Sequence, residues 1–301
     1  MADSLPRAVR LKLEQTLAQW HHWRCDPPLA GAPQVERALA PGMSNYSILV
    51  SAGSAFVVRI DGNDPSTNGL NRQNEWRCLE AAHAAGLAPQ PRYFNPELGS
   101  LVCDYLPPDE AQPLDLADVA RLLRAIHRLP ARHSRLDIGE RLLRYERHLQ
   151  QRHAGAGDDT LLAALLRYRP AVLGHLAQIG ETEQAPLVLC HNDLLRANRI
   201  YSGGRLWAVD WEYSAMGSPW YDLAVVVAGD DLEQGQAQAL LEAYLGRSAS
   251  GDEQRALQRQ GCVYRYLELL WYLAQPQAPL PPPALEEKLA GLARAVSPGS
   301  W

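Results

Sequence analysis

The residues that could carry chemistry lie in two short segments, each of which follows an apolar run. The first is HNDLLRAN (191–198), and the second is DWEY (210–213). Phosphoryl transfer needs a carboxylate that orients a hydroxyl, an amide that faces a metal ion, and a second carboxylate that chelates this metal. Asp193, Asn198 and Asp210 supply these groups in this order, and Mg²⁺ prefers such oxygen ligands. We expect the three side chains to share one magnesium-bound triphosphate.

The spacing of the two segments suggests how they could meet. Seventeen residues separate Asp193 from Asp210, which is room for a loop, a short strand, a turn and a return strand. We therefore expect both loops at the same edge of one sheet. A simpler interpretation is a hairpin whose Asp and Asn side chains bond only their own backbone. The H-x-D-x-x-x-x-N spacing and the repeated apolar-then-acidic pattern favour the catalytic interpretation.

The composition is that of a globular protein. Of 301 residues, 47% are hydrophobic and 21% charged, and the net charge of −5 argues against a nucleic-acid binder. The five Cys residues form no CxxC pair and are expected to be buried, reduced thiols. No stretch approaches 18 apolar residues, and the first residues lack the apolar core of a signal peptide. We expect a cytoplasmic protein without a membrane span.

Apolar periodicity predicts a small sheet with an inserted helix in the first third, followed by a mainly helical part. The predicted elements of the first third are a helix over 5–20, a hairpin over 46–62, a helix over 69–86 and two strands over 89–107. Later helices are predicted over 115–129, 137–152, 159–178, 219–229, 233–246, 252–275 and 284–295, with strands between 186 and 209 and a stiff Pro-rich connector over 276–283.

The two motifs HNDLLRAN and DWEY resemble those of the choline/ethanolamine kinase branch of the aminoglycoside-phosphotransferase-like superfamily, a pattern that thiamine kinases share. The resemblance extends over roughly residues 35–275. It implies an α+β, protein-kinase-like fold with two lobes and the cofactors ATP and Mg²⁺. Residues 1–104 would form the nucleotide-binding lobe, and 105–301 the catalytic and substrate-binding lobe.

The resemblance also implies nucleotide-binding residues in the first third. PGMSNYS takes the place of a family turn in which Ser44 and Asn45 would cover the ATP phosphates. Arg59 in FVVRI stands where protein kinases have Lys, and Glu75 on the following helix would be its partner. Asp104 in LVCDYLP falls at the expected interlobe hinge, whose backbone would bond adenine. His127 and His191 are expected to be structural.

The acceptor is expected to be the hydroxyl of a small cationic alcohol, because aromatic faces attract such cations. By resemblance, Tyr213 and Trp271 would contact the substrate, and Glu212 would supply negative charge. Tyr264, Tyr266 and Tyr272 are expected to be core residues. The segment LAVVVAG after Asp222 lacks an acid that choline kinases have, so choline or ethanolamine and thiamine both remain open. An aminoglycoside or amino sugar is less favoured, because carboxylates do not gather after residue 230.

The sequence argues against two other classes of protein. A non-catalytic, nucleotide-binding pseudokinase would lack the catalytic or the metal-binding Asp, and both are present. A protein kinase would need D-F-G, A-P-E and an activation segment after Asp210, which are missing from the sequence. A small-molecule kinase is therefore preferred, and the choice of ATP over GTP and the oligomeric state stay open.

Overall fold

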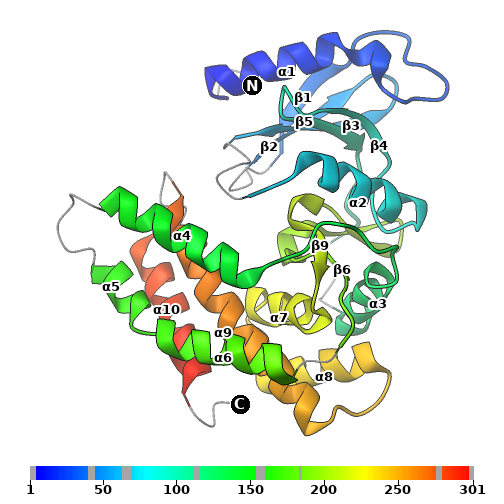
Figure 1. Ribbon diagram of the computed structural model, residues 1–301. Coiled ribbons are helices and arrows are strands. Elements are labelled where there is room, and N and C mark those ends of the chain that lie inside the picture. The colour runs from blue at the N-terminus through cyan, green and yellow to red at the C-terminus, as the bar shows by residue number, and fades with distance from the viewer. Residues whose placement is uncertain are drawn as a thin grey trace. The chain divides into compact units, whose positions relative to one another are not determined.

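The computed structural model describes residues 5–39, 45–62, 69–110, 115–153, 160–182, 185–275 and 280–297 (Figure 1). The chain divides into two compact units. The first contains Met1–Pro113 and Asn198–Ser214, and the second contains Leu114–Ala197 and Ala215–Trp301. The units thus differ from the predicted ranges 1–104 and 105–301, mainly because the segment with DWEY belongs with the N-terminal residues. The predicted α+β class, with a small antiparallel sheet and a mainly helical part, is confirmed.

A five-stranded antiparallel sheet forms the centre of the first unit. Its order is β1-β2-β3-β5-β4. The strands are β1 (Gln34–Ala38), β2 (Asn45–Ser51), β3 (Ala55–Asp61), β4 (Pro91–Asn95) and β5 (Ser100–Asp104). The predicted hairpin is β2–β3, in which Gly53 adopts φ +77° in the turn. Left-handed backbone of this kind favours glycine, so the SAGS turn fixes the register of the pair.

One face of this sheet packs against α1 (Arg7–Ala18). Alternating residues of β2 and β3 point into this core, because side chains along a strand alternate between faces. The core consists of Leu5, Val9, Leu13, Trp23, Ile48, Val50, Phe56, Val58, Ile60, Tyr93 and Val102. The remaining residues of β3, Arg59 and Asp61 among them, point away from this core and are free to carry charge.

Helix α2 (Arg72–Ala84) and the hairpin of β7 (Arg199–Ser202) and β8 (Arg205–Ala208) complete the first unit. Asn71 caps α2 by accepting a hydrogen bond from the Asn74 N–H. The Ala208 N–H donates to the Leu87 carbonyl at 2.9 Å, just beyond α2. The hairpin is thereby anchored, and it continues into the short 3-10 helix η5 (Trp211–Tyr213).

The second unit is helical around α9 (Gly251–Ala274), which packs against α4, α6, α7 and α10 (Figure 1). Its helices are α3 (Leu116–Ile126), α4 (Ile138–His153), α5 (Thr160–Leu166), α6 (Arg169–Thr182), α7 (Pro219–Gly229), α8 (Gln234–Leu245), α9 and α10 (Pro282–Val296). Two short strands, β6 (Val188–Cys190) and β9 (Ala215–Gly217), pair antiparallel. Among the described helices, none is both long and apolar enough to cross a membrane.

Candidate active site

A buried ionic network lies at the ends of β3, α2 and β8 in the first unit. It joins two guanidinium groups to four carboxylates, and its members are Arg59, Asp61, Arg72, Glu75, Asp210 and Glu212. Strand alternation aims Arg59 and Asp61 away from the α1 core, and Glu75 lies on the turn of α2 that follows Arg72. Segments far apart in the sequence are thus tied together by charge.

Arg72 connects three of the acids. Its Nε and Nη2 donate to Oδ2 and Oδ1 of Asp61 at 3.0 and 2.7 Å, a bidentate pair. Its Nη1 donates to Glu75 Oε2 at 2.7 Å and to Glu212 Oε2 at 2.9 Å. The side chain is only 8% exposed. Removing Arg72 would leave these carboxylates buried without compensation.

Arg59 pairs with the predicted partner and with the DWEY acid. Its Nη1 lies 2.5 Å from Glu75 Oε1 and donates to Asp210 Oδ1 at 2.6 Å. Burial alone would raise the pKa of Glu75, but the charges of Arg59 and Arg72 reverse this effect and lower the pKa below its ordinary value. Glu75 is therefore ionised at neutral pH, as an ion-pair partner must be.

The pKa of Asp210 is shifted in the opposite direction to that of Glu75. Burial and the nearby Glu212 carboxylate raise the pKa of Asp210 above its ordinary value, and the pull of Arg59 does not offset them. Its backbone adopts φ +62°, a left-handed conformation that is uncommon outside glycine and concentrates at functional sites. The side chain is 29% exposed, the most of any network member for which an ion pair is described.

These observations fit a divalent cation. With all members ionised, the four carboxylates outweigh the two guanidinium groups, so the network has a formal charge of −2. A carboxyl with a raised pKa and partial exposure is one whose negative charge a metal ion would stabilise. The Asn198 carbonyl accepts from the Val209 N–H at 3.0 Å, so the backbones leading to Asn198 and Asp210 lie side by side. Both residues could supply oxygen ligands to Mg²⁺.

The prediction that the strands before Asp193 and Asp210 belong to one sheet is wrong. β6, which precedes Asp193, pairs with β9, whereas β8, which precedes Asp210, pairs with β7 in a separate sheet. The physical reason is that the SGG turn closes β7 and β8 into their own hairpin, with Gly203 and Gly204 both at positive φ. The β8 edge is thereby used within the hairpin, and β6 takes its partner from residues 215–217.

The predicted nucleotide-binding residues have different surroundings. Ser44 lies outside the described residues. Asn45 is 6% exposed, and its Nδ2 donates to Glu212 Oε2 at 2.9 Å. Asp104 accepts from Arg92 Nε and Nη2 at 2.6 and 2.8 Å, so its carboxylate has a structural partner. The nucleotide-binding roles of these residues stay predictions.

In the second unit, the loop that carries Asp193 is fixed by a buried carboxylate on α7. Asp222 is fully buried, and its Oδ2 and Oδ1 accept from the backbone N–H groups of His191 and Asn192 at 2.9 and 2.7 Å. Asn192 adopts φ +62° immediately before Asp193. A strained residue pinned by two hydrogen bonds sets the direction in which the chain presents Asp193.

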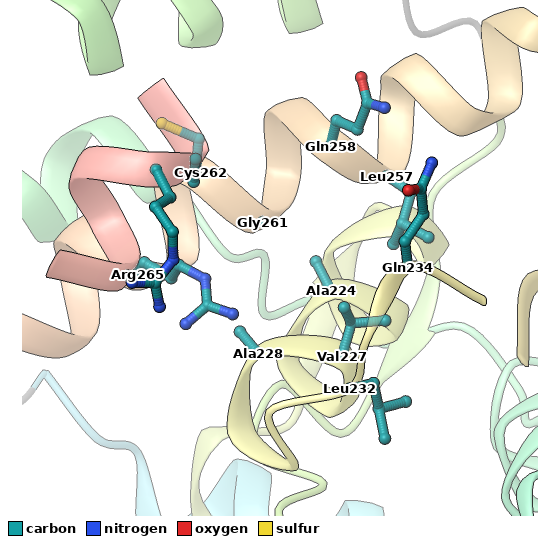
Figure 2. A pocket seen from close by; sticks show the side chains of 13 residues that line it. Ala224, Val227, Ala228, Leu232, Gln234, Leu257, Gln258, Gly261, Cys262 and Arg265 are labelled. Carbon is teal, nitrogen blue, oxygen red and sulfur yellow. The ribbon is translucent and has the colours of Figure 1, made fainter. Parts of the chain in front are cut away.

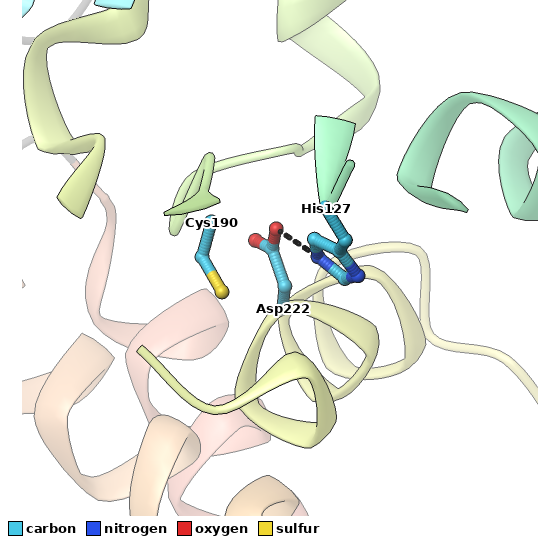
Figure 3. Close-up of side chains that lie close together, drawn as sticks. All are labelled: His127, Cys190 and Asp222. Carbon is cyan, nitrogen blue, oxygen red and sulfur yellow. Dashed lines mark hydrogen bonds and ion pairs between the residues drawn. The ribbon is translucent and has the colours of Figure 1, made fainter. Parts of the chain in front are cut away.

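His127 holds the other side of Asp222 (Figure 3). Its Nε2 lies 3.0 Å from Asp222 Oδ2, and its Nδ1 lies 2.8 Å from the Tyr244 hydroxyl. Burial would raise the pKa of Asp222, but the hydrogen bond and charge of His127, with further help from His191, lower it. His127 thus has the structural role expected from the sequence, in support of the Asp193 loop.

The ligand atoms of His127, Cys190 and Asp222 lie within 4.8 Å of one another, a spacing that a metal ion could use (Figure 3). The hydrogen bonds argue for a different role. Both Asp222 oxygens already accept from N–H groups, and burial raises the pKa of the Cys190 thiol well above its ordinary value. A neutral thiol is a poor metal ligand, so the group serves as a brace for the loop.

We expect Asp222→Asn to destabilise the protein by about 2–4 kcal/mol at pH 7, because one backbone N–H would face an amide donor in a buried site. Since the folded-state pKa of Asp222 is lowered, its contribution is present above the unfolded-state value of about 3.9 and is lost as pH falls through the folded value. Urea unfolding of wild type and variant at pH 7 and at about pH 2.5 measures both effects, because only the lower pH lies below the unfolded-state value of about 3.9.

Asp252→Asn is the matched control, because Asp252 is 93% exposed and pairs with Arg255 at the surface. Its free energy of unfolding should stay within about 0.5 kcal/mol of the wild-type value. Equal stabilities for the two variants would contradict the role assigned to Asp222.

One face of α9 gathers groups that could bind a cation. Tyr264, Glu268 and Tyr272 follow each other at intervals of four residues and are buried. Burial raises the pKa of Tyr264 and of Tyr272, and the charges of Glu268 and Asp193 add to this effect in both cases. The two rings therefore lie within electrostatic reach of both carboxylates.

The other predicted substrate residues divide between the units. Trp271 on α9 is partly buried, and its ring lies edge-on to Tyr272 with centroids 5.0 Å apart. Glu212 and Tyr213 are in the first unit, and the Glu212 carboxylate is 3% exposed and bonded within the ionic network. Tyr264, Tyr266 and Tyr272 all belong to the buried core, as expected, and the Tyr266 hydroxyl donates to Glu146 at 3.1 Å.

Three important residues were not singled out from the sequence. Arg72 is the fourth residue of the helix predicted over 69–86 and belongs to no motif. Asp222 was noted only as a position matching the family, and its hydrogen bonds depend on tertiary structure. Glu268 could have been found, because its spacing from Tyr264 and Tyr272 places all three on one helix face.

Comparison with known proteins identifies the family. The model of the phosphotransferase enzyme family matches residues 35–258. The chain belongs to this family. The LicA protein of Haemophilus influenzae is 25% identical to this phosphotransferase over 244 residues, which are 77% of this chain and 70% of LicA. The match agrees with the resemblance drawn from HNDLLRAN and DWEY.

Two solved structures share the fold of this phosphotransferase. A choline/ethanolamine kinase family protein from Mesorhizobium loti has a TM-score of 0.71 at 23% identity, with 95% of this chain and 96% of that chain covered. The choline kinase LicA from Streptococcus pneumoniae has a TM-score of 0.72 at 20% identity, with 94% and 97% covered. The predicted family and the phosphotransferase class are confirmed by the family model, and the two solved structures show the same fold.

Proposed function

We propose that this phosphotransferase transfers the γ-phosphoryl group of Mg²⁺-ATP to the hydroxyl of a small cationic alcohol, with choline or ethanolamine as the favoured acceptor. The observation that carries the proposal is the α9 face, where Glu268 lies between two buried tyrosines, Tyr264 and Tyr272, whose rings are both within electrostatic reach of Asp193. A carboxylate and aromatic faces together bind an organic ammonium group. The hydroxyl of such an acceptor is a few bonds from its ammonium group, and Asp193 would accept the proton of this hydroxyl.

The position of Lys288 supports a cation site at this face. Its ammonium nitrogen lies 2.8 Å from Glu268 Oε1 and 5.5 Å from the centroid of the Tyr272 ring. Burial raises the pKa of Glu268, and Lys288 offsets only part of this effect. An ammonium group of the chain itself therefore uses the two kinds of contact that a choline headgroup needs. Glu268 would supply the negative charge at the substrate that the resemblance assigns to Glu212.

Each group has a defined task in the proposed reaction. Asp193 orients the acceptor hydroxyl and accepts its proton, and the backbone bonds from Asp222 fix the Asp193 loop. Asn198 and Asp210 would bind Mg²⁺, which neutralises phosphate charge when bound. Arg59, oriented by Glu75, would contact a phosphate oxygen. No covalent enzyme intermediate is required.

The proposal is tested by measuring ADP release with Mg²⁺-ATP and a panel of acceptors: choline, ethanolamine, thiamine, an amino sugar and an aminoglycoside. We expect choline or ethanolamine to give the highest kcat/KM. Thiamine as the best acceptor would change the substrate but retain the cationic alcohol. Turnover with none of the panel, in a protein that binds Mg²⁺-ATP, would favour the pseudokinase.

The α9 face gives a sharper prediction, because two variants should change the KM of the acceptor in opposite directions. Glu268→Gln removes the negative charge and should raise the KM for the cationic alcohol about tenfold. Lys288→Met removes the competing ammonium and should lower it. Steady-state kinetics at saturating ATP measure both values, and a change of the same sign in both variants would contradict the assigned cation site.

A further inference from the structure

A cavity of about 250 Å³ lies in the second unit among α7, the beginning of α8, α9 and α10 (Figure 2). None of the residues proposed for catalysis lines it. It exists because small residues face one another across the helices: Ala224 and Ala228 on α7, Gly261 on α9 and Gly291 on α10. A methyl group added at Gly261 would meet no atom within 4 Å, so the space beside this glycine is open.

The floor of the cavity is apolar. Ala224, Val227, Ala228 and Leu257 line it and are at most 7% exposed. A cavity of about 150 Å³ with such walls accommodates benzene, so this one has room for a hydrocarbon body of roughly ten heavy atoms. An inorganic ion alone would leave this floor in contact with water.

The rim of the cavity is polar and positively charged. Arg265, Arg294, Gln234 and Gln258 line it, and Figure 2 places Arg265 at one end and the two glutamines at the other. Gly291 makes room for the Arg265 guanidinium, since a Cβ at Gly291 would lie 3.3 Å from Arg265 Nη1. The arginine is seated by the packing of α10 and is 20% exposed.

The contact between Arg265 and Asp231 is loose enough to admit a ligand. Asp231 Oδ1 lies 3.9 Å from Arg265 Nη1, and the Asp231 side chain is 84% exposed. The distance is at the limit for an ion pair and the carboxylate is solvent-exposed, so this contact contributes little and a ligand oxyanion could replace it. A cationic ligand would be repelled by two guanidinium groups, whereas a carboxylate or phosphate group can accept hydrogen bonds from them.

We propose that this cavity is a binding site for a small amphipathic anion, with a hydrocarbon body over Ala224 and Ala228 and an oxyanion headgroup at Arg265. The cavity shares no lining residue with the groups assigned to phosphoryl transfer, although the charge of Arg265 reaches Glu268, and its test does not depend on that activity. Either a carboxylate or a phosphate monoester has the required chemistry, and octanoate and octyl phosphate distinguish the two headgroups.

Isothermal titration calorimetry of the full chain with octanoate tests the proposal. We expect a dissociation constant below about 1 mM, and binding at least tenfold weaker for octan-1-ol and octylamine, which lack the anionic headgroup. Octyl phosphate tests the alternative headgroup, and inorganic phosphate tests the headgroup alone, which should bind at least tenfold more weakly. If neither octanoate nor octyl phosphate binds more tightly than octan-1-ol, the proposal is overturned.

Three variants of cavity residues and one control variant locate the binding. Gly261→Leu fills the cavity and should abolish octanoate binding, whereas Gly174→Leu, at an exposed glycine of α6 with equal free space, should not change it. Arg265→Met should weaken octanoate at least tenfold and leave octan-1-ol unchanged. Gly261→Ala guards against misfolding: it should weaken octanoate several-fold with a melting temperature at or above that of the wild type. Wild-type affinity in Gly261→Leu or Arg265→Met would overturn the site.

Discussion

Asp193→Asn should lower kcat by about 10²–10⁴-fold with the acceptor that the wild type uses, while the fold and the binding of nucleotide are preserved. The variant has the same shape but can no longer accept the hydroxyl proton, and proton transfer by a positioned side chain contributes a factor of this size. The hydrogen bonds that the backbone N–H groups of His191 and Asn192 donate to Asp222 do not involve the Asp193 carboxylate. The loop should therefore keep its conformation.

The measurement is ADP release under saturating substrates, together with the melting temperature and the dissociation constant of Mg²⁺-ATP. The melting temperature should remain within about 2 °C of the wild-type value, because Asp193 is only partly buried. The KM of the acceptor should change less than kcat, since the lost interaction is made in the transition state. A variant that turns over at the wild-type rate would exclude Asp193 as the base.

Asp210→Ala should abolish Mg²⁺-dependent use of ATP, with a loss of at least about 1,000-fold in kcat/KM. The network keeps its other contacts, because Arg59 still pairs with Glu75 at 2.5 Å. Burial and Glu212 already disfavour the charge of Asp210. Removing that charge should leave the melting temperature unchanged or raise it. The loss of activity could then not be attributed to unfolding.

Titration of nucleotide with and without Mg²⁺ measures the loss directly. The wild type should bind ATP more tightly with Mg²⁺, and the variant should show no such difference. Glu97→Gln is the control, because Glu97 lies in an exposed turn of the same unit. Unaltered metal dependence in Asp210→Ala would show that Asp210 does not bind the ion, whatever its effect on rate.

The order of the main elements could be predicted from periodicity and turn residues. Helix α7 occupies the predicted range 219–229, and the β2–β3 hairpin and α2 lie where predicted. The pair Arg59–Glu75, placed by resemblance, is present as an ion pair. These features depend on local pattern or on a motif with defined spacing, which a single sequence contains.

The elements that were missed are specified by tertiary contacts. β1 (Gln34–Ala38) is exposed at all five residues and shows no apolar alternation, so only its pairing with β2 makes it a strand. The helix predicted over 159–178 is α5 and α6, separated before Arg169. Pro170, in the first turn of α6, was the signal for a new start. The three-residue β9 is too short for any period to appear.

The candidate site was predicted in its residue types and less well in its connections. Asp210 and Arg59 were named, but Arg72 and Asp61, which complete their network, look like ordinary surface charges in the sequence. Charge burial depends on what packs around a side chain, and that packing comes from segments more than a hundred residues away. A single sequence identifies the groups that fit a known spacing, but not the residues that pair with these groups and orient them.

The discontinuous first unit has a consequence for synthesis on the ribosome. Glu212 accepts from Arg72 and Asn45, yet residues 114–197 of the second unit must be translated before it emerges. At typical elongation rates of ~5–20 residues per second, Glu212 is synthesised on the order of ten seconds after the N-terminal sheet. During this interval Arg72 and Asn45 lack one of their native acceptors, so the ionic network of the first unit cannot be completed until residue 212 has been synthesised.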